Sequence, residues 1–293
     1  MFNVVQTKSF IFIIMFHLMI IVSVYGDAQQ ETKKFVDENK SKKNIIFLHH
    51  SIGEQVYYTG LVAEWINDYN VKNNTEINLT ERKFPTKPYA WNNYPYDFWN
   101  LWVTENKPGI IRKAACDSSN INIECLDTLA INFDVIIFKH CYPGSDVEAD
   151  TGNPDVSSNI KSIENYKLQY RALRRQFEKY PDTLFILWTL APRHRLRTTQ
   201  EHAARAKLFV DWVNNEFLSE GDTDHLNIYI FDFWGLVAEK NVSSRQVNTL
   251  KYEYERSHTD KDSHPNDLAN EKVGPLFAKF IVDSVFKFKK IRH

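Results

Sequence analysis

The stretch Asn44-Ile45-Ile46-Phe47-Leu48-His49-His50-Ser51-Ile52-Gly53 decides the fold of this chain. Its apolar residues form a short continuous run, which is typical of a buried parallel strand. The histidines, serine and glycine after it suit a tight turn into a helix, predicted over residues 54–69. A serine in such a turn lies at the carboxyl edge of the sheet, where open α/β sheets bind ligands. Ser51 is therefore predicted either as a nucleophile or as the N-cap of that helix.

Buried strands and amphipathic helices alternate along the rest of the chain. Further strands are predicted over residues 76–79, 134–138, 184–188 and 227–233. Helices are predicted over residues 163–177 and about 199–217, and a final helix ends near Phe286. Gly274-Pro275 either begins this last helix or interrupts it. Apolar strands separated by helices predict one α/β domain over residues 44–293, with a parallel sheet covered by helices on both faces.

The N-terminus has the layout of a secretory signal peptide. Lys8 precedes an apolar run over residues 10–24, and cleavage is predicted after Gly26, so residues 1–26 form the signal peptide. An uncleaved anchor is the alternative, although the run is shorter than the roughly twenty apolar residues of a membrane span. The polar residues 27–43 are predicted to be a disordered lead-in. The mature protein is expected to be secreted or periplasmic, with no stable membrane association.

The net charge limits the classes of binding partner, and the cysteines bear on the redox environment of the protein. The chain has 36 basic and 37 acidic residues, a formal net charge of −1, so nothing steers it toward nucleic acid or an acidic membrane surface. Cys116 and Cys125 flank a polar loop and could close a disulfide, which would leave Cys141 as a buried free thiol. The alternative is three unrelated reduced cysteines.

Aromatic residues crowd the stretch 87–103, which contains three tryptophans. Pro85, Pro88 and Pro95 argue against a long helix there. The stretch is predicted to be an ordered loop that folds over the sheet edge. It would either grip a ligand such as a carbohydrate or form a hydrophobic flap without a ligand.

A second motif lies just before the final helix. Pro265 restricts the backbone at His264, and Asn266 can cap a helical turn that follows. Serine is a poor nucleophile at neutral pH and needs a base within hydrogen-bond reach, which works better when a carboxylate fixes its tautomer. Ser51, His264 and a nearby aspartate could supply these three roles. The alternative is that His264 is an ordinary histidine of a surface loop.

Taken together, Ser51 with Gly53 early in the chain and Asp262-Ser263-His264-Pro265-Asn266 near its end resemble the SGNH (GDSL-like) hydrolase superfamily. The resemblance spans roughly residues 44–286. It implies a flavodoxin-like three-layer fold and hydrolysis of an ester through an acyl-serine intermediate. Ser51 would be the nucleophile, His264 the general base and Asp262 or Asp260 the acidic member, with no metal and no cofactor. The expected substrate is a small-molecule or carbohydrate ester, such as an acyl or acetyl group on a sugar.

The chain departs from the family pattern in three ways. His49-His50 stands where the family usually has Gly-Asp before the serine, and Lys261 stands where it usually has the aspartate. The glycine and asparagine that usually donate to the oxyanion have no clear counterparts. Candidate donors are the backbone amide of Ser51 and the asparagines of the aromatic stretch, Asn92, Asn93 and Asn100.

Two other classes of function remain open from the sequence. One is a secreted binding module that keeps the hydrolase fold without activity, since one fold hosts many functions. The other is a metal-dependent hydrolase, because imidazole and carboxylate groups near the strand ends could bind zinc. The candidate ligands are His49, His50, His140, His194, Asp232 and His264.

Overall fold

The computed structural model describes residues 42–87, 89–104, 125–221 and 224–292. One compact unit, Lys43–Tyr69 with Ile77–His293, contains the sheet. The other, Met1–Lys42 with Asn70–Glu76, is described at Lys42 and at residues 70–76. The predicted signal peptide lies outside the described residues, as does the lead-in apart from its last two residues. Lys43, the last of these, already belongs to the first strand.

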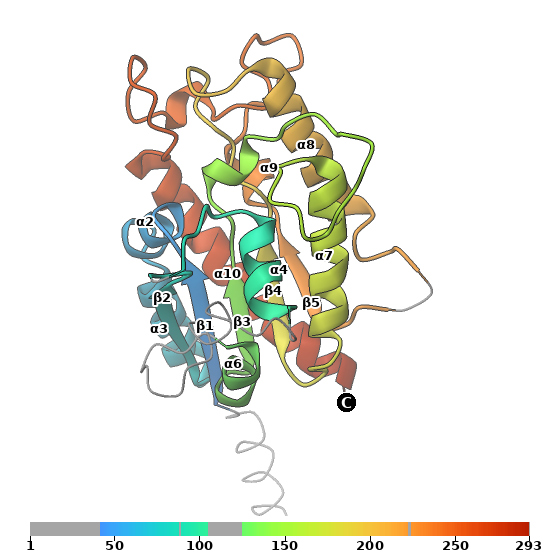
Figure 1. Ribbon diagram of the computed structural model, residues 1–293. Coiled ribbons are helices and arrows are strands. Elements are labelled where there is room, and N and C mark those ends of the chain that lie inside the picture. The colour runs from blue at the N-terminus through green and yellow to red at the C-terminus, as the bar shows by residue number, and fades with distance from the viewer. Residues whose placement is uncertain (1–41, 88, 105–124, 222–223, 293) are drawn as a thin grey trace, which may run out of the picture. The chain divides into compact units, whose positions relative to one another are not determined.

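Five parallel strands form the sheet, in the order β2-β1-β3-β4-β5 (Figure 1). Their bounds are β1 Lys43–His49, β2 Ile77–Lys83, β3 Val135–Phe138, β4 Leu184–Trp188 and β5 Ile228–Phe231. β1 pairs with β2 on one side and with β3 on the other. This is the flavodoxin-like order, whose ligand-binding crevice opens at the carboxyl ends of β1 and β3. The predicted α/β class with a parallel sheet is confirmed.

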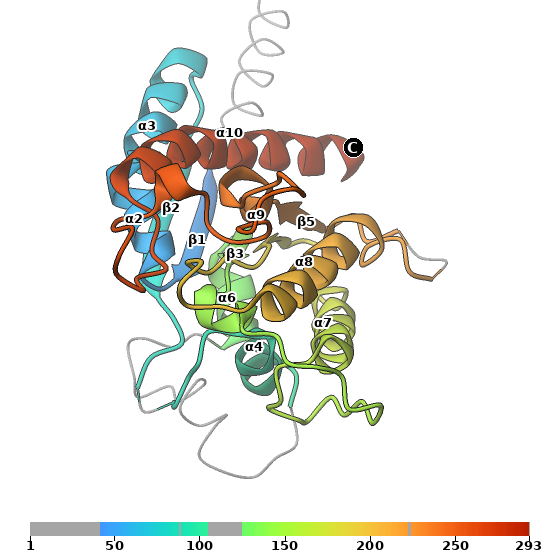
Figure 2. The same cartoon turned by 90° about the horizontal axis from the view of Figure 1, so that it is seen from above.

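Helices cover both faces of the sheet, so the fold has three layers (Figure 2). The helices on one face are α2 (Ile52–Thr59), α3 (Val62–Asn73), α9 (Phe233–Val237) and α10 (Asp267–Arg292). The helices on the other face are α4 (Pro95–Trp102), α6 (Leu126–Asn132), α7 (Ile163–Phe177) and α8 (Gln200–Asn215). Short 3₁₀ turns lie at η1 (Tyr142–Ser145) and η2 (Tyr252–Tyr254).

Alternate side chains of each central strand pack into two separate hydrophobic cores, one on each face of the sheet. Ile46 and Leu48 of β1 pack with α4, α6, α7 and α8, whereas Ile45 and Phe47 pack with α2, α3 and α10. Successive side chains of a strand point to opposite faces, so a strand between two apolar layers must be apolar at every position. This explains the continuous apolar run that identified β1, β3 and β4 in the sequence. β2 lies at the sheet edge with exposed polar positions, and it extends to Lys83, beyond the predicted residues 76–79.

The helix predicted over residues 54–69 is two helices, because the chain turns at Gly60 and Leu61. Leu61 has φ 51°, which ends α2 before α3 begins. Gly60 contacts the backbone of α10: a Cβ on Gly60 would lie 2.7 Å from Gly274 Cα, and one on Gly274 would lie 2.1 Å from the Gly60 carbonyl oxygen. α10 therefore crosses the end of α2 where Gly274 of α10 meets Gly60, the residue directly after α2. Gly274-Pro275 neither begins nor interrupts α10, which runs from Asp267 to Arg292.

The prediction of a loop over residues 87–103 is wrong for α4. Pro95 occupies the first turn of this helix, where a proline lacks no hydrogen bond and its fixed φ suits the helix. Phe98, Trp99 and Trp102 of α4 are buried in the core beneath the sheet edge. Most of the aromatic residues in this stretch thus serve core packing, which neither the ligand-binding loop nor the hydrophobic flap had predicted.

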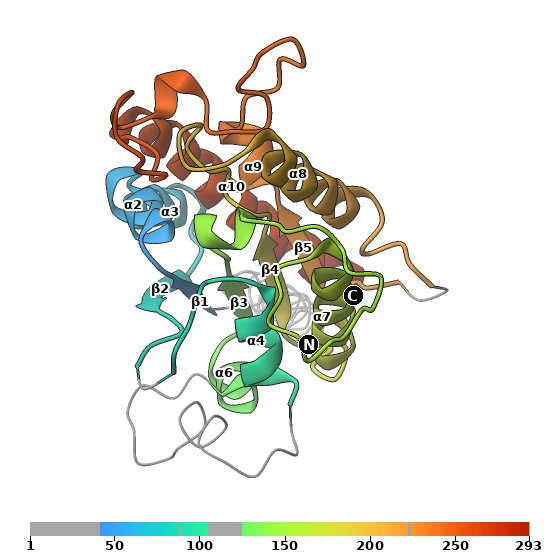
Figure 3. The same ribbon diagram turned by 45° about the horizontal axis from the view of Figure 1, so that its top comes forward.

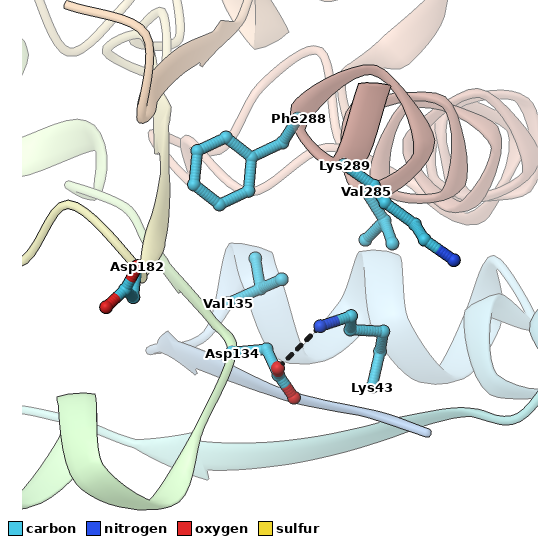
Figure 4. A pocket seen from close by; sticks show the side chains of 7 residues that line it. All are labelled: Lys43, Asp134, Val135, Asp182, Val285, Phe288 and Lys289. Atoms are coloured by element: carbon cyan, nitrogen blue, oxygen red, sulfur yellow. Dashed lines mark hydrogen bonds and ion pairs between the residues drawn. The ribbon is translucent and has the colours of Figure 1, made fainter. Parts of the chain in front are cut away.

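A cavity of about 250 Å³ opens at the amino edge of the sheet (Figure 4). Lys43 and Asp134 form an ion pair at its floor, with Nζ 2.7 Å from Oδ1, and α10 contributes Val285 and Phe288 to its wall. This edge is opposite the one that carries Ser51, so the cavity belongs to none of the predicted sites. Within the described residues, no helix, α10 included, has the length and apolarity needed to cross a membrane.

We expect Gly274→Ala to destabilise the protein. An alanine in a helix normally stabilises it by up to about 1 kcal/mol relative to glycine. Here the added methyl group would overlap the backbone of Gly60, and relieving that overlap is expected to cost about 2 kcal/mol or more. Urea unfolding measures the change. Glu271→Ala, at an exposed position of the same helix, is the matched control and is expected to leave the midpoint nearly unchanged. Equal midpoints for the two variants would contradict the glycine crossing.

Candidate functional site

The candidate site lies at the carboxyl ends of β1 and β3. Ser51 follows β1 and Cys141 follows β3, and the Ser51 Oγ atom lies 3.3 Å from Cys141 Sγ within hydrogen-bond range. The loop that carries His264 leads into α10 and lies at the same end of the sheet as the start of α2 (Figures 1 and 3). The motifs from the two ends of the chain therefore lie at the same end of the sheet.

Ser51 has a strained backbone and does not cap the helix that follows it. Its φ is 27° and its ψ is −79°, and its side chain makes no capping hydrogen bond to α2. A residue other than glycine at positive φ costs about 1–3 kcal/mol and persists where the surrounding structure enforces it, often at functional sites. The N-cap interpretation of Ser51 is therefore wrong, and its hydroxyl is directed at the end of β3 instead.

Asp262 and His264 form a directly bonded pair. His264 Nδ1 donates to Asp262 Oδ1 at 2.5 Å, and the His264 backbone amide donates to the same oxygen at 3.0 Å. Partial burial acts to raise the pKa of Asp262, but the hydrogen bonds from His264 outweigh it and hold the pKa below its usual value. The other ring nitrogen, Nε2, is buried and has no hydrogen-bond partner among the described residues.

Of the two acids left open by the sequence, Asp262 is the one that contacts His264. Asp260 is exposed, and its Oδ1 accepts a hydrogen bond from the Lys261 backbone amide. A carboxylate that accepts from Nδ1 fixes the tautomer in which Nε2 can take up a proton. The geometry of the pair is that of an oriented base.

The loop that carries His264 is anchored on both sides. Ser263 Oγ accepts a hydrogen bond from the His194 backbone amide after β4, at 3.0 Å. Asn266 Oδ1 accepts from the Ala269 amide at 3.1 Å and so caps α10, as predicted. The Asn266 side-chain amide also donates to the Glu253 carbonyl. These bonds hold the imidazole in place before any ligand binds.

Ser51 and His264 contact consecutive residues of the loop after β3. The Cys141 thiol is hydrogen-bonded to the Ser51 hydroxyl, and the ring of Tyr142 packs edge to face on the His264 ring with centroids 5.0 Å apart. Among the described residues, the hydrogen bond of Ser51 Oγ goes to Cys141, and His264 Nε2 has no partner, so no bond joins the serine to the histidine. The roles predicted for Ser51, His264 and Asp262 remain predictions.

His50 connects the site to the aromatic stretch. Its Nε2 atom donates to the Pro85 carbonyl at 2.6 Å, and its ring stacks on Trp91 with centroids 3.9 Å apart. Burial lowers the pKa of His50, which favours the neutral ring. Trp91 is partly exposed, and through this contact it is an aromatic side chain that the stretch places against the residue before Ser51.

The residues proposed as zinc ligands do not converge. His49 Nε2 lies 2.7 Å from Glu81 Oε2, and His194 Nε2 donates to the Ser257 carbonyl. Asp232 accepts from the Gly235 amide and caps α9. Within the described part of the chain, no three His, Cys, Asp or Glu side chains are grouped so that they could hold a metal ion. The metal-dependent hydrolase therefore has no support in the arrangement of these side chains.

The asparagines proposed as oxyanion donors have other contacts. Asn100 in α4 donates to the Tyr89 hydroxyl at 3.2 Å, and Asn92 is exposed. Asn93 contributes its backbone carbonyl, which accepts from the Cys141 amide at 3.1 Å. Of the donors considered from the sequence, the backbone amide of Ser51 is the one at the site.

Three residues at the site were not recognised as functional candidates in the sequence. Lys139 and Tyr142 were passed over, and Cys141 was predicted as a buried thiol, which it is. Their signal was their position directly after the strand that pairs with β1, which becomes visible once the strand order is known. Cys125 is disulfide-bonded, in line with the predicted bridge, and its predicted partner Cys116 lies outside the described residues.

The fold and this edge define a three-layer α/β protein with a polar site at the β1–β3 crevice. No protein-family model matches the chain, and no curated protein matches it. Among solved structures, the chain is similar to a gut microbial diltiazem-metabolizing enzyme, with a TM-score of 0.45 and 13% sequence identity. The match covers 82% of this chain and 47% of that enzyme, so the chain spans about half of its length.

Two buried histidines near the site, His49 and His140, predict that the folded protein loses stability in acid. His140 is the residue chosen to test this. Its ring packs among Phe98, Phe138 and Tyr170, and neither of its nitrogens has a hydrogen-bond partner within the described part of the chain. Burial, reinforced by Lys139, lowers its pKa to about 3. The unfolded chain would take up a proton on this residue below about pH 6.5, so folding stability falls as the pH drops from there toward 3.

We expect His140→Leu to reduce this dependence by about 1.4 kcal/mol per pH unit between pH 6 and pH 4. Urea unfolding of both proteins across this range measures it. His49, whose pKa burial also lowers to about 3, keeps part of the dependence in the variant. An unchanged slope would show that His140 does not stay neutral in the folded protein.

Proposed function

We propose that this protein is an exported serine ester hydrolase of the SGNH type, with Ser51 as nucleophile, His264 as general base and Asp262 as the acid that orients His264. The observation that carries the proposal is the bonded Asp262–His264 pair beside a strained serine that does not cap its helix. Both parts lie at the crevice where folds of this topology bind ligands. An acyl or acetyl group on a carbohydrate is the proposed substrate, with Trp91 as a surface for the sugar.

The proposed reaction has two halves. Ser51 Oγ attacks the ester carbonyl carbon while its proton passes to His264 Nε2, and the alcohol leaves with that proton as the acyl-serine forms. A water then gives a proton to His264 and attacks the acyl carbon, the acid departs, and Ser51 regains its proton. The Ser51 backbone amide donates to the oxyanion in both halves. Asp262 stabilises the imidazolium that appears in each.

Several features support this assignment of roles. His264 Nε2 has no hydrogen-bond partner among the described residues, so no other group there competes with the serine proton for it. Hydrogen bonds between a nucleophile and its base are often long before substrate binds, so a missing Ser51–His264 bond does not exclude the pair. The contacts that Cys141 and Tyr142 make keep both groups on one two-residue segment.

A serine-directed phosphonate probe tests the nucleophile. We expect the purified protein to be labelled on Ser51, and labelling to disappear in Ser51→Ala. Ser219→Ala removes an exposed serine elsewhere and is the matched control, expected to label like the wild type. Labelling is read by mass spectrometry of the intact chain and of its peptides. A wild-type protein that resists the probe would favour the binding module without activity, and label that survives Ser51→Ala would refute the nucleophile.

Asp262→Asn tests the acidic member against its neighbour. An amide at this position cannot accept from Nδ1 in the same way and would favour the wrong imidazole tautomer, so kcat is expected to fall by about a hundredfold or more. Asp260→Asn, two residues away and exposed, is expected to keep kcat within about twofold. A panel of acetyl and longer-chain p-nitrophenyl esters provides the rates and the acyl preference. Equal losses in the two variants would contradict the role of Asp262.

A further inference from the structure

A buried lysine lies beneath the turn that carries Ser51. Lys139, the first residue after β3, is 1% exposed, and its Nζ atom donates to the His50 carbonyl at 3.4 Å. That carbonyl belongs to the peptide unit that precedes Ser51. Gly53 makes room for the lysine, because a Cβ on Gly53 would lie 2.8 Å from Lys139 Cδ. The missing side chain at residue 53 therefore lets Lys139 pass under the first turn of α2.

Cys141 contacts the serine itself. It lies two residues after Lys139, and its Sγ atom lies 3.3 Å from Ser51 Oγ. Lys139 and Cys141 thus contact the turn at two points, the His50 carbonyl and the Ser51 hydroxyl. Cys141 is 2% exposed, and its backbone amide is held by the Asn93 carbonyl, so the thiol has little freedom to move.

The lysine has no compensating acid. Within the described residues, no carboxylate forms an ion pair with Lys139, and burial lowers the pKa of its amine against the opposing effect of Cys141. A buried ammonium without a counter-ion costs several kcal/mol of stability, and a methionine of similar length would avoid that cost. Buried ionisable groups of this kind concentrate at functional sites, where they are retained for chemistry.

We propose that Lys139 and Cys141 are positioning residues for Ser51. Lys139 Nζ donates to the His50 carbonyl and so fixes the peptide unit that precedes Ser51, and the Cys141 thiol donates to Ser51 Oγ. The two contacts hold Oγ in one orientation and leave the serine proton free for His264. The lysine also places a positive charge beneath the turn, which favours the negative charge that develops on Oγ during attack. This inference rests on the proposed function and adds Lys139 and Cys141 to the residues that act on Ser51.

Three variants test these contacts: Cys141→Ala, which removes the thiol, Cys141→Ser, which keeps a hydroxyl in its place, and Lys139→Met, which keeps the length and removes the charge. The measurements are the rate of phosphonate labelling at Ser51, kcat and KM on the best ester, and stability in urea. We expect Cys141→Ala and Lys139→Met to label about tenfold slower or more, with kcat reduced and KM nearly unchanged. Cys141→Ser should recover most of the rate lost in Cys141→Ala.

Stability separates positioning from a structural role. Lys139→Met is expected to be at least as stable as the wild type, because it removes a buried charge that no acid neutralises. A less stable Lys139→Met would show that the lysine serves the fold and would overturn the inference. So would wild-type labelling rates in Cys141→Ala and Lys139→Met, or a Cys141→Ser variant as slow as Cys141→Ala. Those results leave the proposed function standing, whereas a wild-type protein that the probe does not label overturns both.

Discussion

The pairing of β1 with β3 is the interaction on which the site depends. Leu48 and Phe138 are the last paired residues of the two strands, and Ser51 and Cys141 each follow their strand's last pair by three positions. In parallel strands, residues that lie the same number of positions after a paired residue reach the same edge of the sheet. Ser51 and Cys141 are therefore in contact, although 90 positions separate them in the sequence. A slip of one residue in this pairing would turn every side chain of β1 to the opposite face and remove the contact.

The same edge concentrates basic groups in an apolar setting. His49, His140 and Lys139 are all almost fully buried, and burial lowers the pKa of each. Two of them flank the apolar cores directly, since His49 stacks near Phe47 and His140 lies between Phe98 and Phe138. A fold selected for stability alone would place hydrophobic residues here. The cost is understandable if the polar groups shape the environment of the hydroxyl that we propose as the nucleophile.

Much of the fold could be predicted from the sequence, because β1, β3 and β4 lie between two apolar layers and show continuous apolar runs. The strand predicted at the sheet edge is shorter than β2, because the polar residues of β2 interrupt the apolar run. The helix α4 could not be predicted, because a proline in the first turn of a helix cannot be told in the sequence from a proline in a loop. The break at Gly60 depends on a helix more than 200 residues later, which no local pattern encodes. At the site, the sequence supplied Ser51, His264 and Asp262 as candidates. The backbone strain at Ser51 and the contacts of Lys139 and Cys141 with the turn that carries it need the strand register and could not be predicted.

The glycine crossing of α2 and α10 links the two halves of the candidate site. α2 begins directly after Ser51, and α10 begins three residues after His264. Where Gly60 meets Gly274, the helices lie backbone to backbone, so neither can slide along the other without a collision. The distance between the Ser51 hydroxyl and the His264 imidazole thus depends on the contact between Gly60 and Gly274, which belongs to neither motif. The loops around the crevice are consequently free to diverge and accept new ligands while the underlying frame stays fixed.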